Sequence, residues 1–224
     1  MNRKWIMKHN LLELFDQIPY FTIEGFKQAL EVSENENQRV REMLSRWAER
    51  GHVLRLKRGI YMTRRFYQLH RSETGFLPAV SAVITPQSYL SLEYVLQRAQ
   101  ILTEATYPIT AITRKNTKTI QNAIGTFSYR HIQEAYYQGF SQHEYHGVLY
   151  GLASVAKALF DYLYLRPLPR ESRTQKLNLA EDLRLNVEEF SIEEREEFEG
   201  YVTMSESAKM AFILRDFQRH TWRP

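Results

Sequence analysis

The chain has 224 residues, of which 43% are hydrophobic and 25% are charged, and it contains no cysteine. This length and composition are typical of a globular chain with two domains rather than of a disordered one. The lack of cysteine excludes disulfide bonds and thiolate chemistry, and no apolar run is long enough to span a bilayer. We find no signal-peptide pattern and expect a cytoplasmic protein.

The net charge of +4 is concentrated in the first third of the sequence. Residues 1–75 hold 14 Lys and Arg against 9 Asp and Glu, whereas residues 76–224 hold 16 against 17. Within residues 39–71, ten basic residues accompany only Glu42 and Glu49, a balance of +8. This distribution favours a polyanionic partner; a solvated basic face is the alternative.

Two short helices are predicted before residue 31. Apolar residues at helical spacing mark their inward faces: Leu11, Leu14 or Phe15, and Ile18 in the first helix, and Ile23, Phe26 and Leu30 in the second. Pro19 ends the first helix, because proline disrupts a helix interior. Thr22 is the expected N-cap of the second helix.

A third helix is predicted from a capping box formed by Ser33 and Glu36. Its apolar stripe consists of Val40, Leu44 and Trp47. Gly51 is the expected stop, since glycine readily adopts the left-handed conformation that follows many helices.

A basic β-hairpin follows in the stretch "VLRLKRGIYM". Leu54 and Leu56 are expected on one side of the strand, opposite Val53, Arg55 and Lys57, and the chain turns near Arg58 and Gly59. Three short helices followed by a tight hairpin predict a winged helix-turn-helix. The alternative is a small helical domain used for protein contacts.

In a winged helix-turn-helix, the third helix enters the major groove of DNA and the hairpin, or wing, contacts the backbone. Asn and Gln pair with adenine and Arg pairs with guanine, so the polar face of the third helix is suited to reading bases. The predicted DNA-binding residues are Asn37, Gln38, Arg41, Ser45 and Arg46 on the helix, and Arg55, Lys57, Arg58, Arg64 and Arg65 in and after the wing.

The predicted fold class is α+β, with a mixed α/β domain after the winged helix. Loss of periodicity at residues 68–78 separates a first domain, 1–72, from a second, 76–224. Thr85 as N-cap and Pro86 as first helical residue predict a helix over residues 87–99. Ser88 and Ser91 on this helix are expected to be exposed rather than to form a site.

Three β-rich runs, "PITAIT", "GTFSYRHI" and "HGVLYGLAS", are predicted as strands. A largely buried helix follows over Val155–Leu165, on which Lys157 and Asp161 are four residues apart and read as a surface ion pair. Helices are expected from about residue 171 to the end, including one that begins at a capping box of Ser191 and Glu194.

Residues 181–199 hold nine acidic side chains against two arginines, which indicates a solvated helical face or a surface for a basic partner. His143 and His146 lack the spacing of a zinc motif and are expected to be exposed side chains. Neighbouring Glu181 and Asp182 diverge on a helix and do not converge on a metal. We expect no catalytic residue, cofactor or metal site, and therefore no enzyme.

The order of these elements resembles the AbiEi antitoxins of type IV, abortive-infection toxin–antitoxin systems. The resemblance covers most of residues 10–165 and includes the "RG-x-Y" hairpin at Arg58, Gly59 and Tyr61, the pair Ser88 and Ser91, and the helix "VAKALFDYL". It implies a repressor of its own promoter whose second domain opposes a nucleotidyltransferase toxin, directly or indirectly. The alternatives are an interaction module that does not bind DNA and an enzyme acting on nucleic acid.

Overall fold

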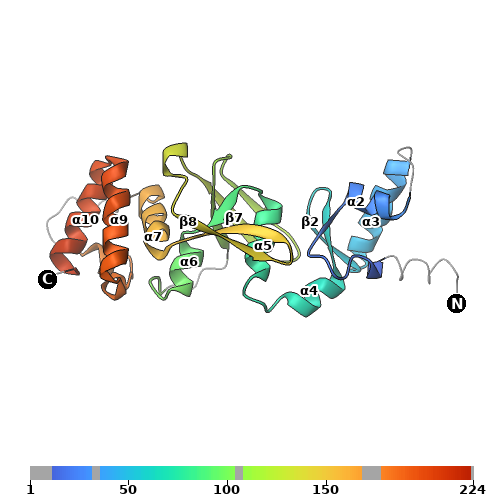
Figure 1. Cartoon of the computed structure of the whole chain (residues 1–224), viewed down its shortest axis with the longest axis horizontal. Coiled ribbons are helices and arrows are strands. Elements are labelled where there is room, and N and C mark those ends of the chain that lie inside the picture. Colours follow the sequence, from blue (N-terminus) through green and yellow to red (C-terminus); the bar gives the residue numbers. More distant parts are fainter. Residues whose placement is uncertain (1–11, 32–35, 104–107, 168–177, 223–224) are drawn as a thin grey trace. The chain divides into compact units, whose positions relative to one another are not determined.

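The computed structural model of the chain describes residues 12–31, 36–103, 108–167 and 178–222 (Figure 1). The chain forms two compact units. The first comprises residues 1–86 together with two hairpin tips, 120–126 and 144–150, and the second comprises residues 87–119, 127–143 and 151–224. Each unit is described by itself below.

The first unit begins with a winged helix-turn-helix, as predicted, and we call its described residues 12–63 the head. Strand β1 (Phe21–Thr22) leads into α2 (Ile23–Ala29), and α3 (Asn37–Glu49) is followed by strands β2 (Val53–Lys57) and β3 (Ile60–Thr63). The three strands form an antiparallel sheet in the order β1-β3-β2. The wing is thus the β2–β3 hairpin.

The head is held together by an aromatic core. Phe15 lies 4.6 Å from Phe21 and 5.4 Å from Phe26 between ring centroids, and Phe26 meets Trp47 edge-on at 5.6 Å. The predicted stripe of Val40, Leu44 and Trp47 is buried. The sequence did not decide whether Leu14 or Phe15 faces inward; Phe15 is buried, whereas Leu14 is 64% exposed.

One of the two predicted signals for the start of a helix in the head can be checked in full. The Thr22 side chain accepts a hydrogen bond from the Gly25 N–H at 3.0 Å, which confirms it as the N-cap of α2. Helix α3 begins at Asn37 with Glu36 as an N-cap that makes no side-chain capping bond. Ser33, the other member of the predicted capping box, lies outside the described residues.

The first unit continues beyond the wing with α4 (Arg64–His70) and α5 (Phe76–Ile84). The Lys57 ammonium donates to the Ile84 carbonyl at 2.9 Å, and the Asn122 amide donates to the Leu56 carbonyl at 2.9 Å. Helix α5 and the 120–126 tip therefore contact the wing. The compact units do not coincide with residues 1–72 and 76–224, and the autonomy of those two segments stays a prediction.

The second unit is built on a mixed sheet with the strand order β6-β7-β5-β4-β9-β8. The strands are β4 (Ser88–Leu90), β5 (Ile109–Thr113), β6 (Lys118–Gln121), β7 (Thr126–His131), β8 (Phe140–Tyr145) and β9 (Val148–Ala153). Strands β5, β7 and β9 confirm the three predicted runs. The tips of the β6–β7 and β8–β9 hairpins belong to the first unit.

The predicted helix over residues 87–99 is wrong. Ser88–Leu90 form β4, a buried central strand that pairs antiparallel with β5 and parallel with β9, and helix α6 covers only Glu93–Arg98. Between them, Leu92 has a positive φ of 59°, which breaks any continuous helix. The pairing of β4 with distant strands therefore prevails over the local Thr85-Pro86 signal.

Helix α7 (Val155–Leu165) has the predicted bounds, but its ion pair is not on the surface. Lys157 and Asp161 are both fully buried and bonded to each other. Asp161 also accepts hydrogen bonds from Ser91 at 2.7 Å and Tyr89 at 3.0 Å. The predictions of an exposed pair and an exposed Ser91 are corrected by this buried network.

The described C-terminal part is helical, as predicted, whereas residues 171–177, where these helices were expected to begin, lie outside the described residues. The helices are α8 (Leu179–Asp182), α9 (Ile192–Ser205) and α10 (Ala208–His220), joined in part by the 3₁₀ turn η4 (Val187–Glu189); another such turn, η2 (Glu134–Tyr136), precedes β8. Ser191 and Glu194 form the expected reciprocal capping box at the start of α9. Trp222 closes this region by donating from its indole nitrogen to the Val187 carbonyl at 2.6 Å.

Candidate nucleic-acid interface

Helix α3 presents a polar face opposite its buried stripe. Gln38, Arg41 and Ser45 are exposed and follow one another at intervals of three and four residues. Residues at this spacing lie on the same side of a helix. Two long side chains with several hydrogen-bonding groups and a small hydroxyl therefore lie on the same side of α3.

The wing is a tight hairpin that turns at a glycine with positive φ. Gly59 has a φ of +80°, a conformation that side-chain-bearing residues rarely adopt, and the register of β2 against β3 shifts between Arg55 and Lys57. Arg55 on β2 and Arg58 in the turn are exposed. The turn and the bulge thus place two guanidinium groups on the outside of the wing.

Helix α3 and the wing line a common groove with a volume of about 960 Å³. Five of the predicted DNA-binding residues line it: Gln38, Arg41, Ser45, Arg55 and Arg58. In the described part of the head, Arg41, Arg55 and Arg58 form no hydrogen bond or ion pair with the protein. Their donors are available to a ligand.

The other five predicted residues do not line this groove. Asn37 and Arg46 are exposed on α3, and the Arg46 Nε donates to the Glu42 carbonyl at 3.2 Å. Arg64 and Arg65 are exposed at the start of α4. Lys57 is only partly exposed, and its ammonium is bonded to Ile84. The structure therefore separates the predicted residues into a groove set and a peripheral set.

The groove also contains acidic residues that the sequence analysis did not select. Glu24, Glu42 and Glu49 line it alongside three arginines, and the Gln38 amide donates to Glu42 at 2.9 Å. The helical spacing of Gln38 and Glu42 was the available signal for this contact. The formal charge of the groove lining is balanced, so the positive excess of the region comes from side chains around it.

Residues 9–63 match the sequence model of the family described as "Transcriptional regulator, AbiEi antitoxin". The head is similar to the AbiEi regulators. The match confirms the resemblance over the winged helix and ends with the wing, before β4 and α7. No curated protein has a significant match to the chain.

The head contains both the groove and most of its basic surroundings. The helix and the wing that form the groove lie wholly inside the matched residues. No helix in the described parts of the chain is long and apolar enough to cross a membrane. The groove therefore belongs to the segment that is similar to the AbiEi family model.

Proposed function

We propose that the head binds duplex DNA, with α3 in the major groove and the wing against the sugar-phosphate backbone. One observation carries this proposal: α3 and the wing place Gln38, Arg41 and Ser45 in the same groove as Arg55 and Arg58. Base-reading and phosphate-binding groups are combined in this way in winged helix-turn-helix proteins.

Each groove residue has a distinct chemical role in this proposal. Arg41 offers two parallel N–H donors to the O6 and N7 atoms of guanine, and Gln38 is suited to adenine. Gln38 must give up its hydrogen bond to Glu42 when it reads a base. Arg55 and Arg58 bind phosphate oxygens, which fixes the position of the protein without reading sequence.

The peripheral residues contribute affinity without sequence preference. Arg46, Arg64 and Arg65 are exposed and contribute to the balance of +8 over residues 39–71. Neutralising phosphates releases counterions, so such groups strengthen binding to any duplex. Asn37 is proposed to contact the DNA backbone. Lys57 is a weaker candidate for DNA binding, because its ammonium is bonded to the Ile84 carbonyl.

We further propose that the chain is a repressor of its own promoter and the antitoxin of a type IV system, without enzymatic activity. The description of the matched family supports a regulator and antitoxin. The second unit opposes a nucleotidyltransferase toxin, by contact or indirectly. Co-expression with the product of the neighbouring gene tests this half: growth inhibition that the chain does not relieve would refute the antitoxin assignment.

DNA binding is tested with full-length protein and a fluorescent duplex taken from upstream of its own gene. Binding should exceed that of a shuffled duplex, and log Kd should depend linearly on log salt, with a slope of about 0.9 per neutralised phosphate. Arg215→Ala removes an exposed arginine from α10 and is the charge-matched control for substitutions of the groove arginines. It should bind both duplexes as the unmodified protein does. Equal binding to both duplexes, or binding unaffected by salt, would overturn the proposal.

A further inference from the structure

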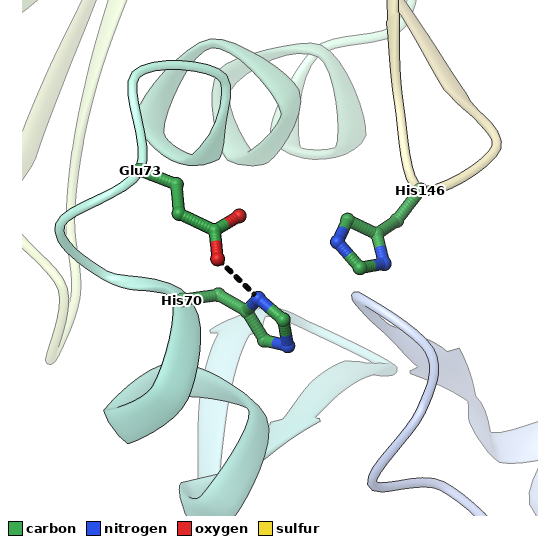
Figure 2. Close-up of side chains that lie close together, drawn as sticks. All are labelled: His70, Glu73 and His146. Atoms are coloured by element: carbon green, nitrogen blue, oxygen red, sulfur yellow. Dashed lines mark hydrogen bonds and ion pairs between the residues drawn. The ribbon is translucent and has the colours of Figure 1, made fainter.

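Three potential metal ligands meet in the first unit, from two distant stretches of sequence. His70 is the last residue of α4, Glu73 lies in the connection between α4 and α5, and His146 lies in the turn between β8 and β9. One ligand atom from each side chain lies within 4.8 Å of the other two. Figure 2 shows the His146 ring directed toward His70 and Glu73.

The carboxylate of this cluster is held at both oxygens. One oxygen of Glu73 lies 2.8 Å from the His70 Nδ1, and the other accepts a hydrogen bond from the Tyr145 hydroxyl at 2.6 Å. These two contacts fix the orientation of the Glu73 carboxylate beside the two imidazoles. A Cβ on Gly75 would lie 2.5 Å from the Tyr145 ring, so Tyr145 is closely packed where it orients Glu73.

Aromatic packing positions the two imidazoles. The His70 ring lies 4.2 Å from the Phe66 ring between centroids, and the His146 ring meets Phe66 edge-on at 5.4 Å. His146 has a φ of +46° and Gly147 a φ of +77°, a tight turn that directs His146 toward the cluster. The ligands are therefore oriented by packing and backbone geometry rather than by chance exposure.

The geometry points to a site for a divalent transition-metal ion of the zinc class, bound by His70, Glu73 and His146. Two imidazoles and one carboxylate are an established zinc donor set that leaves a further position for water. Zinc bonds of about 2.0–2.1 Å place tetrahedral ligands about 3.3 Å apart, so the three side chains must close slightly around the ion. The sequence-based expectation of no metal site is revised by this proposal.

Such an ion would tie the β8–β9 tip to the connection between α4 and α5. The two segments are separated by about seventy positions in the sequence, and both belong to the first unit. Because the ligands bind the metal only when they are brought together by folding, the ion would stabilise the folded unit. This role is independent of DNA binding and of any toxin.

The test is calorimetric titration of tag-free, chelator-stripped, full-length protein with Zn²⁺ and, separately, with Mg²⁺. We expect one Zn²⁺ per chain and no Mg²⁺, since imidazole ligands favour zinc over magnesium. His146→Asn and Glu73→Gln should each weaken binding by about 100-fold or more. Tyr145→Phe should weaken it by about 10–100-fold, the usual effect of losing a group that orients a ligand.

His143→Asn is the matched control, because His143 is exposed on β8 and lies outside the cluster. It should bind zinc as the unmodified protein does. A second measurement guards against misfolding: Zn²⁺ should raise the thermal midpoint of the unmodified protein and of His143→Asn but not that of His146→Asn. No zinc binding by the unmodified protein, or equal binding by His146→Asn, would overturn the proposal.

Discussion

The groove arginines of the head and Lys157 of the second unit use positive charge in opposite ways. The groove arginines Arg41, Arg55 and Arg58 are exposed and, in the described part of the chain, form no ion pair with protein groups. Lys157 is fully buried, paired with Asp161, and 5.0 Å from the Phe160 ring centroid. The charges of the three groove arginines are thus available to a ligand, whereas the charge of Lys157 is committed to the fold.

The buried pair has a cost that the exposed arginines avoid. Burial lowers the pKa of Lys157 and raises the pKa of Asp161, and the ion pair opposes both effects. Hydrogen bonds from Ser91 and Tyr89 also favour the charged carboxylate. The network therefore links β4 and the adjacent Ser91 to α7 through four polar side chains that depend on one another.

The largest effect is expected when one partner of this pair is removed. Asp161→Ala leaves the Lys157 ammonium buried without its counter-charge, which costs about 3–5 kcal/mol of folding stability. Urea unfolding followed by circular dichroism measures this loss. A cost below about 1 kcal/mol, the range of surface ion pairs, would contradict the structural role that we assign to the pair.

A second variant separates charge burial from simple packing loss. Lys157→Met combined with Asp161→Asn removes both charges while keeping an acceptor for the hydroxyls of Ser91 and Tyr89. Because contacting residues are energetically coupled, the double variant should deviate from the sum of its single variants by about 0.5–3 kcal/mol, in the direction of greater stability. Additive losses in a double-mutant cycle would show that the two side chains act independently.

The head should respond to substitution through binding rather than folding. Arg41→Ala is expected to weaken binding to the preferred duplex by about 1–3 kcal/mol and to relax the preference at one base pair. Fluorescence anisotropy with single-base duplex variants measures both changes. If the Arg41→Ala variant keeps full affinity and an unchanged base preference, Arg41 is not part of the interface.

The smallest effect is expected on head stability. Arg55→Ala and Arg58→Ala each remove an exposed side chain with no protein partner among the described residues, so each should change the free energy of unfolding by less than about 0.5 kcal/mol. The same urea measurement used for Asp161 checks this. Losses comparable to that of Asp161→Ala would show that the wing arginines belong to the fold.

The contrast between the exposed groove arginines and the buried Lys157 also explains what could be predicted from the sequence. The stripe of Val40, Leu44 and Trp47 and the bounds of α7 follow from helical periodicity, a local signal that survives folding. An i, i+4 pair of Lys157 and Asp161 has the same spacing whether it is exposed or buried. Whether the pair is buried depends on α9 and β4, which are remote in sequence. The spacing alone therefore led to the wrong prediction of an exposed pair.

Other elements were missed for related reasons. Ser88–Leu90 is a strand because β5 and β9 flank it, although Thr85 and Pro86 provide a good local helix start. Strands β6 and β8 carry mostly exposed residues, so no apolar alternation marks them. Within the candidate interface, residue types indicated the arginines, but only the fold distinguishes Arg55 from Lys57, whose ammonium is bonded to Ile84.

The most direct test of the central claim compares Arg41→Ala with Arg58→Ala on the promoter duplex and on a shuffled duplex over a range of salt concentrations. Arg41→Ala should reduce the ratio of the two affinities, because it reads a base. Arg58→Ala should weaken binding to both duplexes alike. It should also reduce the slope of log Kd against log salt by about 0.9, the value for one phosphate contact. If both variants bind both duplexes as the unmodified protein does, the groove between α3 and the wing is not a DNA-binding site.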